Sequence, residues 1–224
     1  MQDIAQAKSN IMKAAESLFK ANVMFRSEHA NLSAKVADDH IVLTKGGSIA
    51  QLTTDSFAVV RLDGTVVDGE IDPVTAEIVE MHTAIYRARP SVGAVFHNHA
   101  PHVTAFAVAQ QPIPLVYEPL LRFGITEPVP VVPWAPRGSE ASVQGIVDIV
   151  REHPGLPAVM LANHGLIAFS ANPQQTAQVI ITLNEAAELT LLASQLGGAQ
   201  PLAEQAVEQV RSRMKQFASA DSLR

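Results

Sequence analysis

Cysteine is absent from the 224 residues, and its absence limits the kinds of site that the chain can build. Without thiols there are no disulfides and no thiolate ligands, so a transition-metal site must use histidine and carboxylate. No run of about 18 apolar residues occurs, so we expect no membrane span. The amino-terminal segment also lacks the apolar core and the cleavage pattern of a signal peptide. A cytoplasmic protein is therefore the simplest expectation.

Positive charge is also scarce, since 16 Lys and Arg stand against 22 Asp and Glu, for a net charge of −6. Nucleic-acid binding needs clustered Lys and Arg, so this balance gives no reason to expect it. Apolar residues make up 47% of the chain and charged residues 17%, which is typical of a globular protein. Because no repeat, low-complexity tract or long linker occurs, we expect residues 1–224 to form a single domain.

Apolar residues recur with helical spacing in some segments and form short β-type runs in others. Helices are expected over 3–21, 75–88, 103–110, 139–152, 173–196 and 202–219. Strand candidates are 41–44, 57–62, 66–67, 93–96, 115–117, 129–132, 158–161 and 166–169. The polar stretch 25–33 is assigned to neither class. This order predicts a mixed α/β domain in which helices cover several antiparallel strands.

The placement of the eight histidines is more informative than their number. His97 and His99 stand two positions apart at the end of an expected strand, so their side chains point to the same side. His164 follows another apolar strand and precedes Gly165, where two backbones can approach closely. If these strands are neighbours, the three imidazoles meet. Three histidines with an open fourth position are typical of a catalytic metal site.

Spacing alone leaves alternatives open, because most such histidine pairs on strands bind no metal. His102 could be a fourth ligand, a partner of a ligand or a surface residue. His82 lies at the edge of the apolar stripe of its helix, which favours a structural role. Trp134, within Pro-Trp-Ala-Pro, is expected to pack rather than to function.

Three motifs, taken in order, resemble the class II aldolase/adducin head family. Glu77–Ala107 carries a Glu, then a His and a Tyr on one helix, then His-x-His. Leu161–Ile167 resembles the family's Asn-His-Gly motif, and Ala30–Ser33 resembles its Gly-Asn-x-Ser turn. The resemblance runs over about residues 4–195. It implies a three-layer α/β/α fold with a mostly antiparallel central sheet, as in fuculose-phosphate-type aldolases and their relatives.

The resemblance also implies a divalent metal and an oligomer. One ion per subunit would be bound by His97, His99 and His164, with zinc favoured over manganese, cobalt or magnesium. The family commonly forms four-fold tetramers with active sites at subunit interfaces, so a homotetramer is expected.

The chemistry implied by the resemblance is that of a lyase acting on a small hydroxy-keto sugar or acid. A C–C bond breaks by aldol cleavage or decarboxylation, and the metal stabilises an enediolate while a carboxylate shuttles the proton. Glu77 and Glu80 are the candidates for this carboxylate. We prefer Glu77, because Glu80 fits a solvated position paired with Arg87. An epimerase or dehydratase with the same metal site, or a non-catalytic adducin-like binding module, remains an alternative.

The expected substrate pocket departs from the sugar-phosphate members of the family. Where these carry hydroxyl side chains around the phosphate, this chain has Glu28, Gly46 and the pair Thr75-Ala76. A carboxylate facing a phosphate is repulsive. The sequence therefore suggests a substrate that lacks a phosphate or binds it differently. The substrate-binding candidates are Glu28, Asn31, Gly46, Gly47 and Arg122.

The segment around residue 117 lies where family members place a loop over the metal. Tyr117 and Glu118 are therefore further acid/base candidates, and Arg122 could pair with a substrate carboxylate. Arg122 could equally anchor the loop.

Overall fold

A computed structural model describes residues 3–221, with side chains described as far as residue 213. Its single mixed sheet has eight strands in the order β4-β3-β2-β1-β5-β8-β7-β6, and every neighbouring pair is antiparallel except β6 and β7. The strands are β1 (Ala30–Ala37), β2 (His40–Thr44), β3 (Phe57–Arg61), β4 (Val66–Asp68), β5 (Ala94–Asn98), β6 (Val131–Val132), β7 (Ala158–Leu161) and β8 (Gly165–Ser170).

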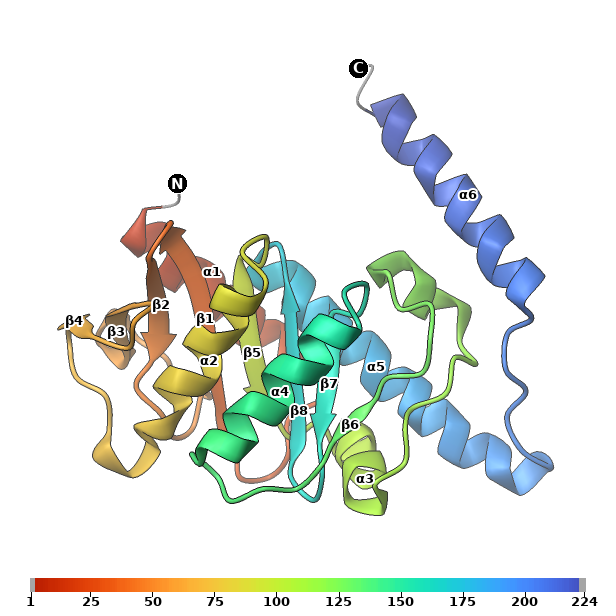
Figure 1. The fold of residues 1–224 in the computed structure, drawn as a ribbon, viewed down its shortest axis with the longest axis horizontal. Coiled ribbons are helices and arrows are strands. Elements are labelled where there is room, and N and C mark those ends of the chain that lie inside the picture. Colours follow the sequence, from red (N-terminus) through yellow and green to blue (C-terminus); the bar gives the residue numbers. More distant parts are fainter. Residues whose placement is uncertain (1–2, 222–224) are drawn as a thin grey trace.

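Helices cover both faces of this sheet (Figure 1). The helices are α1 (Ile4–Lys20), α2 (Glu77–Ala88), α3 (Pro101–Ala109), α4 (Glu140–Glu152), α5 (Pro173–Ala193) and α6 (Glu204–Asp221). Helices α2 and α4 pack on one face, and α1, α3 and α5 pack on the other. The three-layer α/β/α arrangement expected from the resemblance is therefore confirmed.

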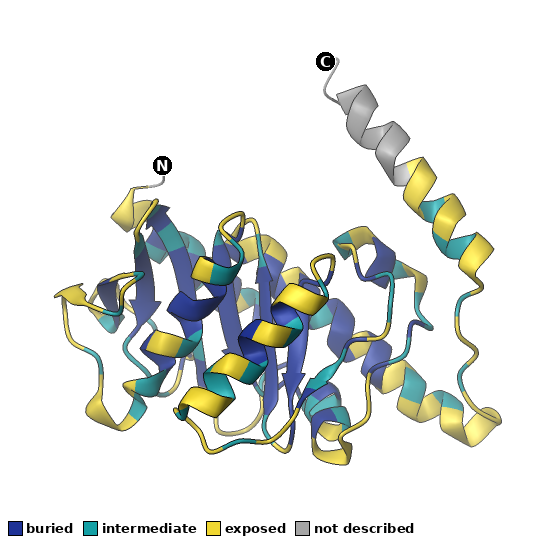
Figure 2. Cartoon of the chain, viewed as in Figure 1, coloured by how far each residue is buried: buried dark blue, intermediate teal, exposed yellow. Residues whose placement is uncertain are grey.

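Two apolar cores result from the alternation of side chains along each strand. In β5, Phe96 faces the core under α1, α3 and α5, whereas Val95 faces the core under α2 and α4. The central strands are buried throughout, while the outer faces of α2 and α4 are exposed (Figure 2). Because each helix buries only the side that packs on the sheet, its apolar residues recur with the helical spacing seen in the sequence.

Two assignments made from the sequence are wrong. The polar stretch 25–33 shows no strand pattern, yet β1 begins at Ala30, and polar Ser33 on this strand is fully buried. The expected strand at 115–117 does not form, and the nearby pairing is a single bridge between Ile113 and Val129. Prolines lack a backbone N–H to donate, and the prolines at 112 and 114 help to explain why no ladder continues there.

The far end of the chain lies outside the layered body. Helix α6 extends away from the sheet and its covering helices (Figure 1). None of the helices in the described part of the chain combines the length and the apolar character needed to cross a membrane.

Candidate metal centre and active site

The three histidines of the sequence motif meet where β5, β7 and β8 come together. His97 lies within β5 and pairs with Ile167 of β8, whereas His99 follows the end of β5. His164 lies in the tight turn that joins β7 to β8. A Cβ atom on Gly165 would lie 2.6 Å from the Asn98 carbonyl oxygen and 2.7 Å from the His99 ring. Only glycine therefore allows the turn to approach this closely.

The three side chains are close enough to share one ion. One ring nitrogen from each of His97, His99 and His164 lies within 4.8 Å of the others. The ring centroids are 4.7–5.0 Å apart. The Nδ1 atom of His97 lies 2.8 Å from the Leu166 carbonyl oxygen, to which it donates. This hydrogen bond leaves Nε2 of His97 unprotonated in the neutral ring, as a metal ligand must be.

The surroundings keep all three imidazoles neutral. Burial, with a further contribution from the neighbouring His164, lowers the pKa of His99 to about 4. Burial, followed by the charges of His164 and His99, holds the pKa of His97 well below its usual value of 6.5. Burial and the positive charge of Arg137 lower the pKa of His164. Neutral imidazole is the form that binds metal, so this set of donors fits a divalent ion.

A pocket of about 260 Å³ opens beside the histidines. Its polar lining includes His29, Asn31, Thr75, Glu77, Arg137 and Ser142, together with the three histidines. Apolar side chains from α2, α4, β6 and β7 form another part of the lining: Ile78, Met81, Val132, Val143, Ile146 and Leu161. The pocket therefore combines polar groups beside the candidate metal site with an apolar wall.

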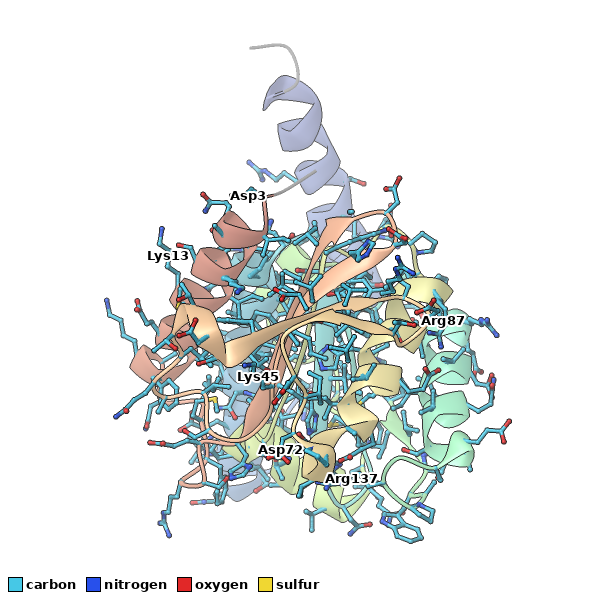
Figure 3. All side chains as sticks on the ribbon, turned by 90° about the vertical axis from the view of Figure 1, so that its left-hand side faces the viewer. Asp3, Lys13, Lys45, Asp72, Arg87 and Arg137 are labelled. Atoms are coloured by element: carbon cyan, nitrogen blue, oxygen red, sulfur yellow. The ribbon has the colours of Figure 1, made fainter. Side chains whose placement is uncertain are left out.

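Glu77 is the carboxylate that the structure brings to this pocket. It lies at the start of α2, and its Oε1 forms an ion pair with Arg137, 2.9 Å from Nε. Arg137 lies beside the beginning of α2, where it also donates to the Val74 carbonyl oxygen (Figure 3). The next residue, Gly138, has a φ of +75°, and a Cβ there would lie 2.8 Å from Cβ of Glu77. Backbone packing and an ion pair thus hold this carboxylate in place.

Arg137 was missed from the sequence. It is separated from Glu77 by about sixty residues, and no local pattern links the loop before α4 to the start of α2. The exposed His29, which also lines the pocket, was missed for the same reason.

Glu80 is a solvent-exposed residue paired with Arg87, as the sequence suggested. Its side chain is half-exposed, pairs with Arg87 and does not line the pocket. Of the two candidate carboxylates on α2, the pocket therefore contains Glu77.

The substrate-binding candidates at the start of β1 and in the loop after β2 divide into two groups. Asn31, Gly46 and Gly47 line the pocket, and no described residue accepts a hydrogen bond from the backbone N–H of either glycine. Glu28 does not line the pocket, and its carboxylate accepts a hydrogen bond from Ser48 instead. A Cβ on Gly46 would lie 2.3 Å from Thr75 Oγ1. The Thr75 hydroxyl thus occupies the space that a side chain at position 46 would need.

The acid/base and binding candidates of the segment around residue 117 do not line this pocket within the same chain. Tyr117 packs against the core under α5, while Glu118 and Arg122 are exposed at a short 3-10 helix, Glu118–Phe123. Glu118 faces α6 residues rather than the histidines. Their catalytic and binding roles remain predictions that depend on contact with another subunit.

The remaining aromatic and histidine predictions have different outcomes. His102 is not part of the metal-binding group among the described residues, since its ring hydrogen-bonds Asn184 and lies near Glu188. Trp134 was expected to pack, but this was wrong: it is 67% exposed and lines the pocket.

This chain is similar to several curated proteins that are named for sugar phosphates. It is 27% identical over 176 residues to a protein named 5-methylthioribulose-1-phosphate/5-deoxyribulose-1-phosphate aldolase from Escherichia coli O45:K1, covering 79% of this chain and 78% of that protein. It is 28% identical over 142 residues, 63% of each chain, to L-fuculose phosphate aldolase from E. coli O6:H1. It is 27% identical to L-ribulose-5-phosphate 4-epimerase UlaF from Salmonella paratyphi B, covering 73% and 75% of the two chains.

Solved structures share the fold. L-fuculose 1-phosphate aldolase superposes with a TM-score of 0.82 at 23% identity, covering 93% of this chain and 96% of that one. YgbL from Klebsiella pneumoniae gives a TM-score of 0.81 at 23% identity, covering 94% and 100%.

A family model described as Class II Aldolase and Adducin N-terminal domain matches residues 9–191, which is most of the chain. The order of motifs, the layered fold and this match agree. The chain belongs to the Class II Aldolase and Adducin N-terminal domain family.

Proposed function

We propose that this protein is a metal-dependent lyase that cleaves a C–C bond in a small hydroxy-keto sugar or acid, by aldol cleavage or by decarboxylation. The observation that carries this proposal is the presence of the Glu77 carboxylate in the same pocket as His97, His99 and His164. A Lewis acid and a proton-transferring group beside one cavity are what such a cleavage requires.

The histidines would hold one divalent ion. Three imidazoles favour zinc when the metals are equally available, with manganese, cobalt and magnesium as alternatives. When bound, the ion would supply Lewis-acid polarisation of a substrate carbonyl. Equilibration with zinc followed by metal analysis tests this directly, and we expect one ion per chain.

Glu77 would carry the proton. Arg137 holds Oε1 of Glu77, and no described residue donates to Oε2. Oε2 would therefore be the oxygen that takes a proton from the substrate and returns it to the product. Arg137 would act as a positioning residue, because its ion pair with Glu77 at 2.9 Å restricts the rotation of the carboxylate.

The structure weakens the sequence argument against a phosphorylated substrate. Glu28, the carboxylate expected to repel a phosphate, lies outside the pocket lining. The backbone N–H groups of Gly46 and Gly47 are unused within the described residues, and both glycines have positive φ values, +124° and +80°. Successive free N–H groups in a turn can bind an anion.

The relatives support the same substrate class. Each of the three curated proteins compared above is named for a phosphorylated sugar. The apolar wall of the pocket fits a substrate with an apolar end, such as the deoxy or methylthio group in the name of one relative. We therefore favour a sugar phosphate over a substrate without phosphate. Micromolar binding of phosphoglycolate to the zinc-loaded protein would support this choice, and failure to bind would restore the phosphate-free alternative.

A screen of aldol donors, sugar phosphates and β-keto acids against the zinc-loaded protein tests the lyase itself. The active substrate is then used with Glu77→Gln and with Glu80→Gln, a matched change on the same helix outside the pocket. We expect Glu77→Gln to lose 100-fold or more in kcat, at the lower end of the usual contribution of general acid–base catalysis, roughly 10²–10⁴-fold. Glu80→Gln should remain within about twofold of wild type. Equal activity in both variants would remove Glu77 from the mechanism.

An epimerase is the second candidate, since one relative carries that name. Product analysis separates the two, because an epimerase returns a sugar of unchanged length whereas a lyase releases two fragments. An adducin-like binding module is the third reading. It requires that neither zinc nor manganese bind stoichiometrically or raise the stability of the fold.

We further propose a homotetramer with active sites between subunits. Several leucines at the end of α5 and just after it are 41–89% exposed: Leu189, Leu191, Leu192 and Leu196. Exposed apolar surface of this kind suits a subunit contact. Tyr117, Glu118 and Arg122 would then serve the pocket of a neighbouring copy. Light scattering after size exclusion should give four chains, and a monomeric mass would refute the arrangement.

A further inference from the structure

A chain of hydrogen bonds runs from the buried interior to the pocket. The Tyr86 hydroxyl lies 2.9 Å from Ser33 Oγ, which lies 2.7 Å from His82 Nδ1. On the other side of the ring, His82 Nε2 lies 2.7 Å from Asn31 Oδ1. Tyr86, Ser33 and His82 are at most 1% exposed, whereas Asn31 lines the pocket. The chain therefore connects a sealed region to the place where a substrate would bind.

The orientation of the Asn31 amide, with Oδ1 toward His82, gives this chain one direction. Oδ1 of Asn31 can only accept, so Nε2 of His82 must carry the proton. A neutral imidazole has a single N–H, and burial lowers the pKa of His82 to about 3, so the ring is neutral. Nδ1 then accepts from the Ser33 hydroxyl, and Ser33 Oγ in turn accepts from Tyr86. Ser33 has one hydroxyl proton, and it goes to His82 Nδ1 at 2.7 Å rather than to the Val95 carbonyl oxygen at 3.3 Å, so both hydroxyl protons point toward His82.

The direction has a consequence at Asn31. With its carbonyl oxygen held by His82, the amide presents its NH₂ end elsewhere, and no described residue accepts from that group. Asn31 is paired with His97 across the sheet, so its amide lies beside the histidine cluster. We propose that His82 is a positioning residue, whose Nε2–H orients the Asn31 amide so that its NH₂ group donates to a substrate oxygen.

The substrate contact in this inference rests on the proposed function, but the direction of the hydrogen bonds does not. If the chain ran the other way, Nδ1 of His82 would carry the proton and donate to Ser33. Asn31 would then donate to Nε2 and turn its carbonyl oxygen to the pocket. An oxygen lone pair would repel a carbonyl, carboxylate or phosphate oxygen. The proton on His82 thus decides whether the pocket offers a donor or an acceptor.

Nitrogen NMR of the protein labelled with ¹⁵N-histidine shows which ring nitrogen of His82 carries the proton. Bare and protonated ring nitrogens of a neutral imidazole have well separated shifts, and the signals of His82 are assigned by their loss in His82→Gln. We expect Nε2 to be protonated and Nδ1 to be bare, with or without zinc. A proton on Nδ1 would overturn the inference. This measurement needs neither substrate nor activity.

Binding of glycolate, a hydroxy acid with two oxygens that can chelate a metal, then tests the consequence in zinc-loaded protein. In His82→Leu we expect binding about tenfold weaker, the size of one lost hydrogen-bond pairing. In His82→Gln, whose amide can still donate to Asn31, binding should stay within about twofold of wild type. His40→Gln, which removes a half-buried histidine beside Asp39, is the matched control and should bind as wild type does.

The zinc content should be equal in all four proteins, because His82 is outside the metal-binding group. If His82→Leu binds glycolate as tightly as wild type, or if Gln rescues nothing, the positioning role is wrong. If wild type binds neither zinc nor glycolate, the proposed function has failed, and the NMR measurement alone decides the direction of the chain. If His82→Leu does not fold, the rescue by His82→Gln and the NMR result remain decisive.

Discussion

The buried imidazole of His82 should make the stability of this fold depend on pH. Burial lowers its pKa from 6.5 to about 3 in the folded protein, whereas the unfolded chain keeps a value near 6.5. Below pH 6.5 the unfolded chain therefore binds a proton that the folded protein excludes. The contribution to stability is fully present above pH 6.5 and is lost as the pH falls toward 3.

The size of the effect follows from the same values. At pH 5 the unfolded imidazole lies 1.5 units below its pKa, and at 1.36 kcal/mol per unit this costs about 2 kcal/mol. At pH 7 the cost is close to zero. The drop in the free energy of unfolding between pH 7 and pH 5 should therefore be about 2 kcal/mol smaller in His82→Gln than in wild type.

Urea unfolding of the metal-free protein at the two pH values measures this drop. Tyr86→Phe is the matched control, because it alters the same buried network but keeps the imidazole, so it should retain the wild-type drop. The low pKa values of the three metal-site histidines add to the pH dependence of every variant equally. Equal drops in wild type and in His82→Gln would refute the reasoning.

Three further outcomes are expected. Zinc at 100 times its dissociation constant should stabilise the fold by about 2.7 kcal/mol and raise Tm by roughly 5–10 °C. The variant His164→Ala should show no such rise in Tm. A wild-type Tm that zinc leaves unchanged would contradict the metal site. Gly138→Ala and Gly64→Ala each place alanine at a positive φ, which costs about 1–2 kcal/mol of stability, but only Gly138→Ala crowds Glu77. Gly138→Ala alone should therefore lose on the order of 100-fold in activity. Equal losses of activity in the two variants would argue against this crowding. Trp134 is the single tryptophan, so its fluorescence should change when glycolate binds the zinc-loaded protein, and unchanged emission at saturation would place the ligand elsewhere.

Much of the fold could be predicted because its signals are local. Helices α2 and α4 cover a sheet on one side only, so their apolar residues recur with helical spacing. The strand β1 was missed, because Ser33 breaks the apolar pattern although it is fully buried. Its burial is tolerated through hydrogen bonds to His82 and Tyr86, which come from a helix about fifty residues later.

The same division holds for the candidate site. His97, His99 and His164 could be named from the sequence, because strand alternation and the following glycine are local rules. The pairing of Glu77 with Arg137 could not be named, because the start of α2 and the loop before α4 meet only in the folded chain. The exclusion of Glu28 from the pocket has the same origin, since its direction is set by Ser48 and a φ of +56°.

The sequence by itself determined the fold class, the family resemblance and the histidines that would hold a metal, since each is carried by short motifs whose own residues lie close together along the chain. Only the tertiary structure decided which carboxylate shares their pocket and what holds it there. It also showed that the Thr75 hydroxyl occupies the space beside Gly46. These facts depend on contacts between distant segments, and such contacts arise only when the layers pack.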